Sequence, residues 1–318
     1  MGASERLTRA FKKAEKNEII FTNEDKFVIL SDSHRGKNDW GDDFAKNQLL
    51  FFHALTSYYE DGFTYIENGD GDELSENWIF RHIRKAHSHV FWLMKRFHNE
   101  GRLIMLYGNH DMARRYPSVV RRQLHTYYDD RQDKVVPLFK DIQLDEGIVL
   151  THQETGKKIF IVHGHQADFF NTYFWWLGVL FLPLWKSIFQ KVLGWRDPTS
   201  PAQNRWKKNK VESHLIDWAG EQNQIIIAGH THRSWHPLPG EPPYFNDGSC
   251  VHPRAITAIE IQNGSLALVK WWLNTKRSVD EDAGEYTRLD RVMYVDRRLI
   301  MTDKSGNPIP PIRLEDLV

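Results

Sequence analysis

Cysteine, net charge and long apolar stretches are all scarce in this sequence. Cys250 is the only cysteine among 318 residues, so no intrachain disulfide can form, which is usual in a reducing compartment. Lys plus Arg and Asp plus Glu both number 42, which gives no electrostatic reason to expect a nucleic-acid partner. The first residues lack the apolar core of a signal peptide. We therefore expect a cytoplasmic protein that binds no nucleic acid.

What the chain does have is a set of short apolar strands that end in polar residues. An example is the predicted strand 103–107, which runs into Gly108-Asn-His-Asp111. Ligands bind beyond the carboxyl ends of strands in open α/β sheets, so we expect the polar residues to meet there. The strand-end residues of the five predicted strands are Asp32, His34, Asp70, Asn109, His163, His230 and His232.

The spacing of apolar residues predicts the elements around these turns. Strands at 27–30, 63–66 and 103–107 alternate with helices at 42–59 and 75–99, a rhythm typical of a parallel sheet with helices outside. Further on, strands at 141–152 and 157–163 form one predicted hairpin. Strands at 255–261 and 265–272 form another around Asn263-Gly264, and a single strand covers 224–228. The second half is therefore expected to be more antiparallel.

Two carboxylates, four imidazoles and one amide are ligands that suit borderline divalent ions such as Mn, Fe or Zn. Seven side chains are too many for one ion, whereas two ions can share a carboxylate. Two metals about 3.5–4 Å apart can hold a hydroxide and polarise a phosphoryl oxygen. The sequence therefore predicts a dinuclear centre, with manganese first and iron or zinc as alternatives.

The ordered set resembles the five blocks of the calcineurin-like metallophosphoesterases over residues 26–261. The matching blocks are Asp32-x-His34, Gly69-Asp70, Gly108-Asn-His-Asp111, His163 and Gly229-His-x-His232. The resemblance implies an α/β fold, a four-layer αββα sandwich. It implies that one ion is held by Asp32, His34 and His232, the other by Asn109, His163 and His230, and that Asp70 bridges them. It also implies that His110 lies near the leaving oxygen and that Asp111 orients and charges it.

The same resemblance implies the reaction class. A metal-dependent phosphoric ester hydrolase is expected, which cleaves a phosphate ester or a pyrophosphate with metal-bound hydroxide. The domain organisation expected is an N-terminal amphipathic helix in 1–25, a phosphoesterase domain in 26–165 and 223–280, and a polar surface tail in 281–318. A helical apolar lid, 166–222, interrupts the phosphoesterase domain.

The lid prediction depends on an uncharged stretch of 13 residues, 173–185, followed by an amphipathic helix. The stretch is too short to span a membrane, which takes about 20 residues. Its place is similar to that of the acyl-binding lid of bacterial UDP-2,3-diacylglucosamine hydrolases, although those enzymes have Arg and Asp where this chain has His110 and His165. A lipid-linked substrate at the inner membrane face, with Trp175 and Trp176 at headgroup level and in contact with substrate, is therefore expected.

Alternatives stay open at this point. The protein could be a UDP-diacylglucosamine-type pyrophosphatase, or a soluble nucleotide or phosphoprotein phosphatase whose lid is a homodimer contact. A non-catalytic scaffold is a further alternative, against which stands the presence of all seven ligands and His110. Among other substrate contacts, Arg35 and Arg233 directly follow ligand blocks and could bind a phosphate bidentately, or form salt bridges at the rim. His165 could lie behind the ligands, contact substrate or simply begin a helix.

Overall fold

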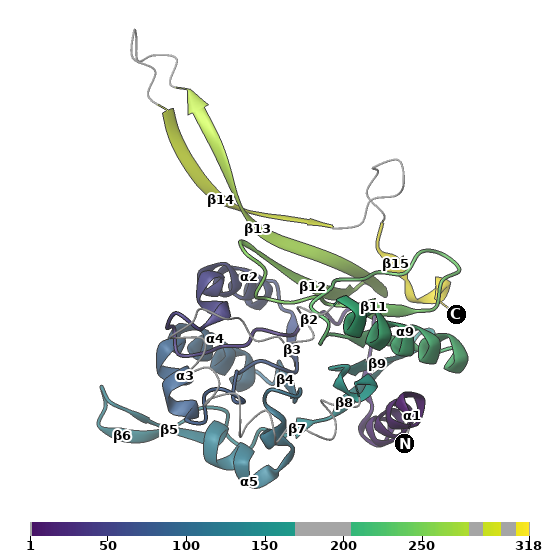
Figure 1. Ribbon diagram of the computed structural model, residues 1–318, viewed down its shortest axis with the longest axis horizontal. Helices are drawn as coiled ribbons and strands as arrows, with labels where there is room; N and C mark the ends of the chain where they lie inside the picture. Colours follow the sequence, from purple (N-terminus) through teal and green to yellow (C-terminus); the bar gives the residue numbers. More distant parts are fainter. Residues whose placement is uncertain (1, 169–204, 280–288, 300–309, 318) are drawn as a thin grey trace.

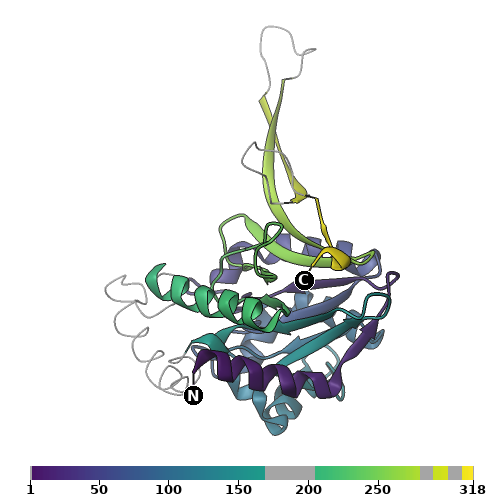
Figure 2. The same cartoon turned by 90° about the vertical axis from the view of Figure 1, so that its right-hand side faces the viewer.

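The computed structural model describes residues 2–168, 205–279, 289–299 and 310–317, and its elements form two stacked β-sheets with helices on both outer faces (Figures 1 and 2). The larger sheet has the strand order β14-β13-β12-β2-β3-β4-β7, and β15 also pairs with β13. Its strands are β2 (Phe27–Leu30), β3 (Thr64–Asn68), β4 (Leu103–Leu106), β7 (Leu144–Asp145), β12 (Ala255–Gln262), β13 (Ser265–Val279), β14 (Leu289–Leu299) and β15 (Ile312–Arg313).

The smaller sheet has the order β1-β8-β9-β10-β11. Its strands are β1 (Ile19–Phe21), β8 (Gly147–His152), β9 (Lys158–Val162), β10 (Ile225–Ala228) and β11 (Tyr244–Asn246). The helices are α1 (Ala3–Ala14), α2 (Gln48–Glu60), α3 (Phe80–Ala86), α4 (Ser88–Asn99), α5 (Pro117–Val120) and α9 (Arg205–Gln222). A separate hairpin is formed by β5 (Thr126–Asp129) and β6 (Lys134–Pro137).

Buried strands explain the four layers, because successive side chains point to opposite faces of a sheet. In β2, Ile29 belongs to the apolar cluster between the two sheets, whereas Val28 and Leu30 belong to the cluster under α2 and α4. In β9, Ile159 also lies between the sheets, whereas Phe160 packs outward against α1 and α9. Strands that are apolar on both faces thus produce the αββα sandwich that the sequence predicted.

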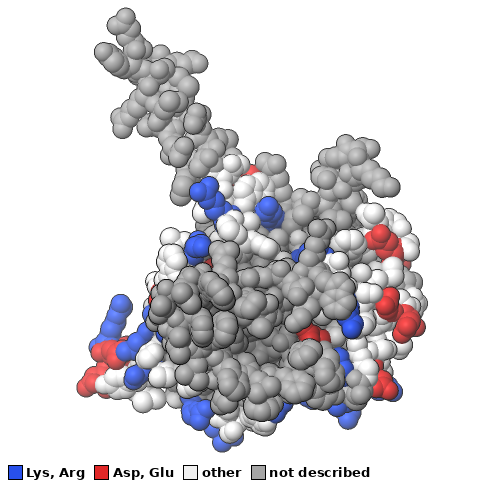
Figure 3. All heavy atoms as spheres, viewed as in Figure 1, with Lys and Arg blue, Asp and Glu red and all other residues white. Residues whose placement is uncertain are grey.

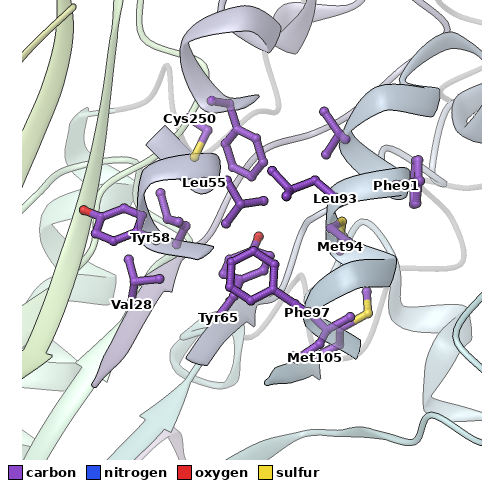
Figure 4. Close-up of a cluster of buried hydrophobic side chains, with 14 of the residues drawn as sticks. Val28, Leu55, Tyr58, Tyr65, Phe91, Leu93, Met94, Phe97, Met105 and Cys250 are labelled. Atoms are coloured by element: carbon purple, nitrogen blue, oxygen red, sulfur yellow. The ribbon is translucent and has the colours of Figure 1, made fainter. Parts of the chain in front are cut away.

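The outer layer over the larger sheet is rich in aromatic side chains. Figure 4 shows Tyr58 of α2 and Phe97 of α4 close to Tyr65 of β3 in this cluster. Cys250 is buried in the same cluster, as expected for a small apolar residue. Tyr65 and Phe97 pack with their ring centroids 5.9 Å apart.

The outer layer over the smaller sheet is made of α1 and α9. The expected amphipathic N-terminal helix is present, and it buries Leu7, Ala10 and Ala14. α9 buries Leu215 and Trp218 in the same apolar cluster. α9 lies within the predicted lid, 166–222, but it packs on the sandwich, so that part is not a lid; residues 169–204 lie outside the described part of the chain.

The single helix predicted for 75–99 is wrong, because the structure has a loop up to Ile79 and then two helices. Ser75 does not cap a helix, since its hydroxyl group contacts Glu73 and His110. The helices α3 and α4 are separated at His87, whose φ of −112° and ψ of 36° are not helical. The His87 ring is hydrogen-bonded to the buried carboxylate of Asp42 at 2.7 Å, and this contact holds the break in place.

The strand predicted for 141–152 is also two strands. β7 pairs with β4 of the larger sheet, whereas β8 pairs with β9 of the smaller sheet. The chain crosses between the sheets at Glu146 and Gly147, where a Cβ on Gly147 would lie 2.9 Å from the carbonyl oxygen of Ile161. The hairpin of β8 and β9 and that of β12 and β13 are confirmed.

The described parts of the C-terminal segment, 289–299 and 310–317, do not form the polar surface tail that the sequence predicted. β14 pairs with β13 along its whole length, and the two strands project from the body as a ribbon in Figures 1 and 2. Leu314 and Leu317 are buried in the cluster between the sheets. Among the described residues, no helix is long and apolar enough to cross a membrane.

Candidate metal centre

The carboxyl ends of five strands meet at one edge of the two sheets. β2, β3 and β4 are parallel neighbours in the larger sheet, so the loops that follow them emerge side by side. β9 and β10 are parallel neighbours in the smaller sheet and bring their loops to the same edge. The residues that these loops carry are Asp32 and His34 after β2, Asp70 after β3, Asn109 and His110 after β4, His163 after β9, and His230 and His232 after β10.

Several of these residues have a backbone conformation that side chains seldom adopt. A positive φ is uncommon outside glycine and costs roughly 1–3 kcal/mol where the surroundings enforce it. The residues of this set with positive φ are Asp32 at 50°, His34 at 47°, Asp70 at 50°, His230 at 68° and His232 at 55°. Such strain concentrates at functional sites, because each turn must direct its side chain to one point.

Two glycines in the motifs allow the loops to come this close. A Cβ on Gly108 would lie 2.1 Å from Oδ1 of Asp70, and a Cβ on Gly229 would lie 2.7 Å from Oδ2 of Asp32. Any side chain at either position would therefore displace a carboxylate of the centre. This is the physical reason for a glycine directly before Asn109 and before His230.

Each carboxylate binds the backbone with one oxygen and faces the histidines with the other. Asp32 accepts the N–H of His230 at 2.8 Å through Oδ2, which leaves Oδ1 at 3.0 Å from Nε2 of His232. Asp70 accepts the N–H of His110 at 2.8 Å through Oδ1, and its Oδ2 lies 3.0 Å from Nε2 of His163. The inward oxygens are thus fixed by bonds that cross from one loop to another.

The histidines are oriented in the same way. Nδ1 of His163 lies 2.8 Å from the carbonyl oxygen of Asn68, and Nδ1 of His34 lies 2.9 Å from Oε2 of Glu73. In both rings Nε2 is therefore the nitrogen that faces the carboxylates. An outer hydrogen bond that fixes the ring and its tautomer is the usual arrangement around a histidine that binds metal.

The resulting groups have the spacing of metal ligands. Ligand atoms lie within 4.8 Å of one another in each of three sets: Asp32, His34 and His232; His34, Asp70 and His110; and Asp70, His163 and His230. Asp70 and His34 each belong to two of the sets, and Oδ2 of Asp70 lies 3.0 Å from Nε2 of His163 and 3.9 Å from Nε2 of His34, so this carboxylate can be shared. Oδ1 of Asn109 is buried and makes no hydrogen bond to any described residue, so an amide oxygen is also available. The donor atoms therefore fit divalent ions.

Mutual attraction between the charges is strong at this edge. Burial favours the neutral acid, but the nearby histidines, His163 first, hold the pKa of Asp70 below its ordinary value. Burial also opposes charge on His163, but Asp70 and Asp32 raise its pKa to about 10. Protons on these rings thus balance the negative charge of the carboxylates. A divalent cation would balance the same charge, so its binding would release protons.

The sequence matches that of a known protein family. The sequence model of the Calcineurin-like phosphoesterase family matches residues 25–234, more than half of the chain. The chain belongs to this family.

Metal-dependent hydrolysis of phosphate esters is the activity of calcineurin-like phosphoesterases, and the candidate metal-ligand groups agree with it. No match is found among curated protein sequences. Among solved structures, that of Vps29 from Chaetomium thermophilum is similar at 10% sequence identity and a TM-score of 0.31, over 89% of this chain and 98% of that chain.

Glu73 is the residue of this phosphoesterase that the sequence prediction missed. Its Oε1 lies 2.8 Å from Nδ1 of His110, while its other oxygen faces His34. Burial opposes ionisation, but the charges and hydrogen bonds of His110 and His34 hold the pKa of Glu73 well below its ordinary value. The spacing Gly69-Asp70-x-x-Glu73 was the signal in the sequence, and nothing in it revealed that Glu73 contacts two histidines.

The role expected for Asp111 is therefore wrong. Its Oδ1 accepts the N–H of Gly108 at 2.6 Å and its Oδ2 lies 3.6 Å from Arg114, so this carboxylate stabilises the turn. Burial raises the pKa of Asp111 to about 7. The carboxylate that orients and charges His110 is that of Glu73.

Arg35 was predicted to contact substrate, and its burial contradicts this. Its side chain is 0% exposed and bonds to both oxygens of Glu67 and to Asp72. His165 is buried as well, with its ring centroid 5.6 Å from that of His163, and its contact with substrate stays a prediction. Burial, together with the charges of His163 and His230, lowers the pKa of His165 well below its ordinary value.

The remaining substrate residues are less constrained. Arg233 forms an ion pair with Glu212 of α9 at 2.7 Å, and its side chain is 40% exposed, so its contact with substrate stays a prediction. Trp175 and Trp176 lie outside the described residues.

The phosphoesterase domain also buries Asp247 beside Ser31 and Asn68, where burial and then the charge of Asp32 raise its pKa well above its ordinary value. Asp247 is far from the motifs in sequence and carried no signal.

Proposed function

We propose that this protein is a dinuclear phosphoesterase that hydrolyses a phosphate ester or pyrophosphate of an amphiphilic, lipid-linked substrate. The observation that carries the dinuclear part is the geometry of Asp70, whose Oδ2 lies 3.0 Å from Nε2 of His163 and 3.9 Å from Nε2 of His34 and so faces ligands of both proposed ions. When bound, two divalent ions would supply the positive charge that polarises a phosphoryl oxygen and the acidity that makes water a nucleophile. Manganese is the ion we expect first, with iron or zinc as alternatives.

In this proposal one ion is held by Asp32, His34 and His232, and the other by Asn109, His163 and His230. Asp70 serves both. The outer bonds from the carbonyl of Asn68 and from Glu73 keep two of the rings in place, so the site does not need to reorganise when it binds a phosphate.

His110 is proposed to hold the proton for the leaving oxygen. Its Nδ1 is occupied by Glu73, so Nε2 is the nitrogen that can present a proton. Burial lowers the pKa of His110, but Glu73 and Asp70 raise it above its ordinary value overall, which keeps the ring protonated. The side chain of His110 is 23% exposed, against 0–2% for His163 and Asp70, so it is open toward a substrate. A positioned acid of this kind contributes roughly 10²–10⁴ in rate.

Exposed aromatic side chains around the centre support the amphiphilic part of the proposal. Four loops that carry candidate ligands or His110 continue into an exposed aromatic residue. These residues, which we name the aromatic rim, are Trp40 at 100% exposed, Trp78 at 60%, Tyr116 at 47% and Trp235 at 42%. Trp and Tyr with one apolar and one polar side favour the interface between lipid headgroups and acyl chains.

Charge on the molecule is compatible with such a surface. Lys37, Arg81 and Arg115 are exposed on the loops or helix beside the rim, and basic residues next to aromatic ones attract anionic headgroups. Figure 3 shows Lys and Arg interspersed with Asp and Glu on the described part of one face. We therefore propose that the enzyme acts at the inner face of a membrane as a peripheral protein.

The metal part of the proposal is tested by removing the shared ligand. Wild-type protein should bind nearly two equivalents of Mn²⁺ in titration calorimetry after chelator treatment. Asp70→Asn should lose both ions together and lose phosphoesterase activity, because both sites depend on the same carboxylate. Asp145→Asn, on strand β7 of the same sheet, is the matched control and should bind as wild type. A single tight ion that is indifferent to Asp70 would refute a dinuclear centre.

The amphiphile is tested by co-sedimentation with vesicles of phosphatidylcholine and phosphatidylserine. Trp40→Ser and Trp78→Ser together should abolish vesicle binding and keep turnover of a soluble aryl phosphate. Trp92→Ser is the matched control, since Trp92 is 54% exposed but lies on α4 and not on a ligand-bearing loop. The lipid-linked substrate is excluded if wild-type protein does not bind these vesicles, or if Trp92→Ser reduces binding as much as the rim variants do. A soluble substrate would then be the better proposal.

A further inference from the structure

Beneath the metal-binding loops lies a group of buried charged side chains that the proposed reaction does not use. We name it the buried ion network; its members are Arg35, Glu67, Asp72, Asp111 and Arg114, each of them 0–2% exposed. Each member stands one or a few residues from a candidate ligand in sequence. Arg35 follows His34, Glu67 and Asp72 flank Asp70, and Asp111 follows His110.

Arg35 is the centre of the network. Its two terminal nitrogens bond to the two oxygens of Glu67 at 2.9 and 2.6 Å, and its Nε bonds to Oδ1 of Asp72 at 2.7 Å. The guanidinium group lies 5.1 Å from the ring centroid of Phe91 on α4. All these donors act in fixed directions, which a lysine ammonium group could not reproduce.

The network joins three loops. Along the backbone, the N–H of His34 bonds to the carbonyl oxygen of Asp70 at 2.9 Å, and the N–H of Arg35 bonds to that of Gly71 at 3.0 Å. Below them the Arg35 side chain joins β3 to the loop after it. Arg114 extends the connection to the loop after β4, because it lies 2.6 Å from Asp72 and 3.6 Å from Asp111.

Close packing of this network allows little movement. A Cβ on Gly71 would lie 1.9 Å from Oε1 of Glu67 and 2.7 Å from Nη2 of Arg35, so the backbone beside Asp70 runs directly over the ion pair. Burying several charges costs free energy that apolar side chains of the same size would not cost. This cost is explained if the network holds strained turns at fixed positions. His34 and Asp70, which lie in these turns, both have positive φ.

We propose that Arg35 and Asp72 are positioning residues of the metal centre, which fix the loops of His34 and Asp70 against each other so that both can bind the same ion. The inference rests on the proposed dinuclear centre and assigns a task to two side chains that reach neither substrate nor metal. Loss of an outer-layer partner typically lowers metal affinity by 10–100-fold.

The test uses Arg35→Lys and Asp72→Asn in the full-length protein. Arg84→Lys is the matched control, since Arg84 is a buried arginine 4.0 Å from the ring centroid of Tyr127 and distant in sequence from the ligand loops. Calorimetry with Mn²⁺ should show a dissociation constant about 10–100-fold higher in both variants and unchanged in the control. Electron paramagnetic resonance should show the spectrum of coupled Mn²⁺ pairs replaced by that of single ions.

Urea unfolding without metal separates positioning from simple stability. If Arg35→Lys lowers the free energy of unfolding but binds Mn²⁺ within about threefold of wild type, the positioning role is overturned while the metal centre stands. If Arg35→Lys does not fold, Asp72→Asn decides, because Asn keeps the shape and can still accept a hydrogen bond from Arg35. A wild-type protein that binds no Mn²⁺ would overturn the proposed function itself, and this inference with it.

Discussion

At the scale of single residues, the centre depends on which atom of each side chain faces inward. Asp32 and Asp70 each use one oxygen for a backbone N–H of a neighbouring loop and keep the other for the histidines. Glu73 contacts Nδ1 of His34 through Oε2, and both of its oxygens lie 2.8 Å from Nδ1 of His110, so it couples a candidate ligand to the candidate acid. The orientation of the candidate ligands and of His110 therefore depends on hydrogen bonds to groups outside the ligand set.

The role of His110 can be tested apart from metal binding. His110→Ala should lower kcat on an aryl phosphate by roughly 10²–10⁴, the usual contribution of a general acid, and should leave metal content unchanged. Glu73→Gln should lower kcat as well and should shift the basic limb of the pH–rate profile to lower pH, because it removes the charge that holds the His110 proton. His82→Ala, an exposed histidine on α3, is the control. Metal loss in parallel with activity would show that His110 is a ligand.

Asp42 should contribute stability that depends on pH. Its carboxylate bonds to Nε2 of His87 at 2.7 Å and accepts the N–H groups of Asn38 at 2.6 Å and Phe44 at 3.0 Å. Burial raises the pKa of Asp42, but these partners, His87 first, lower it below its ordinary value overall. A lowered folded pKa means that the contribution is complete above the unfolded value of about 3.9 and is lost as the pH falls through the folded value.

Asp42→Asn should therefore lower the free energy of unfolding by about 1–3 kcal/mol at pH 7. The difference from wild type should shrink as the pH falls below about 4, where the wild-type carboxyl group is also protonated. Urea unfolding at several pH values measures this. Asp39→Asn in the same loop is the control, since Asp39 is half exposed. A difference that stays constant with pH would show that shape, and not charge, is what Asp42 contributes.

At the scale of elements, a buried carboxylate links the C-terminal ribbon to the sandwich, in addition to the pairing of β13 with β12. Glu260 of β12 is 1% exposed, accepts the hydroxyl group of Tyr58 at 2.6 Å and forms an ion pair with Arg297 of β14. Trp271 of β13 donates its indole N–H to the same tyrosine at 2.8 Å. Strands β12, β13 and β14 and helix α2 therefore share one polar contact inside an apolar cluster.

Removing Arg297 should weaken this attachment. Arg297→Met should lower the free energy of unfolding by about 1–3 kcal/mol, because Glu260 keeps its burial and loses its cation. The double variant Arg297→Met with Glu260→Gln should recover part of the loss, since no buried charge then lacks a partner. Thermal and urea unfolding report both values. If the double variant loses more free energy of unfolding than the two single variants lose together, the ion pair is not what connects β14 to the body.

At the scale of the whole molecule, the site exists because two sheets end at the same edge. The larger sheet supplies Asp32, His34, Asp70 and Asn109, and the smaller one supplies His163, His230 and His232. Each set by itself is incomplete. The apolar cluster between the sheets, which includes Ile29 of β2 and Ile159 of β9, holds the two halves together, so loss of packing there should disturb metal binding as well as stability.

Local patterns in the sequence were sufficient for the strands that carry the site and for the family. Each strand such as β2 or β9 is a short apolar run followed by a polar turn, and both signals lie within a few consecutive residues. The glycines at 108 and 229 also stand beside the residues whose approach they permit. The four-layer sandwich was implied by the resemblance to the family, and strands apolar on both faces agree with it because they must be covered on both sides.

Only the tertiary structure decided which distant groups meet. The charge of His110 is balanced by Glu73 and not by the adjacent Asp111, because the turn directs Asp111 toward Gly108 and Arg114. Arg35 points into the body because Glu67 and Asp72, from another strand and its loop, offer bonds that no solvent-facing position provides. Leu314 and Leu317 become core residues because the fold places them in the apolar cluster between the two sheets. Sequence patterns report what one segment prefers, whereas pairing between segments depends on where the fold brings each of them.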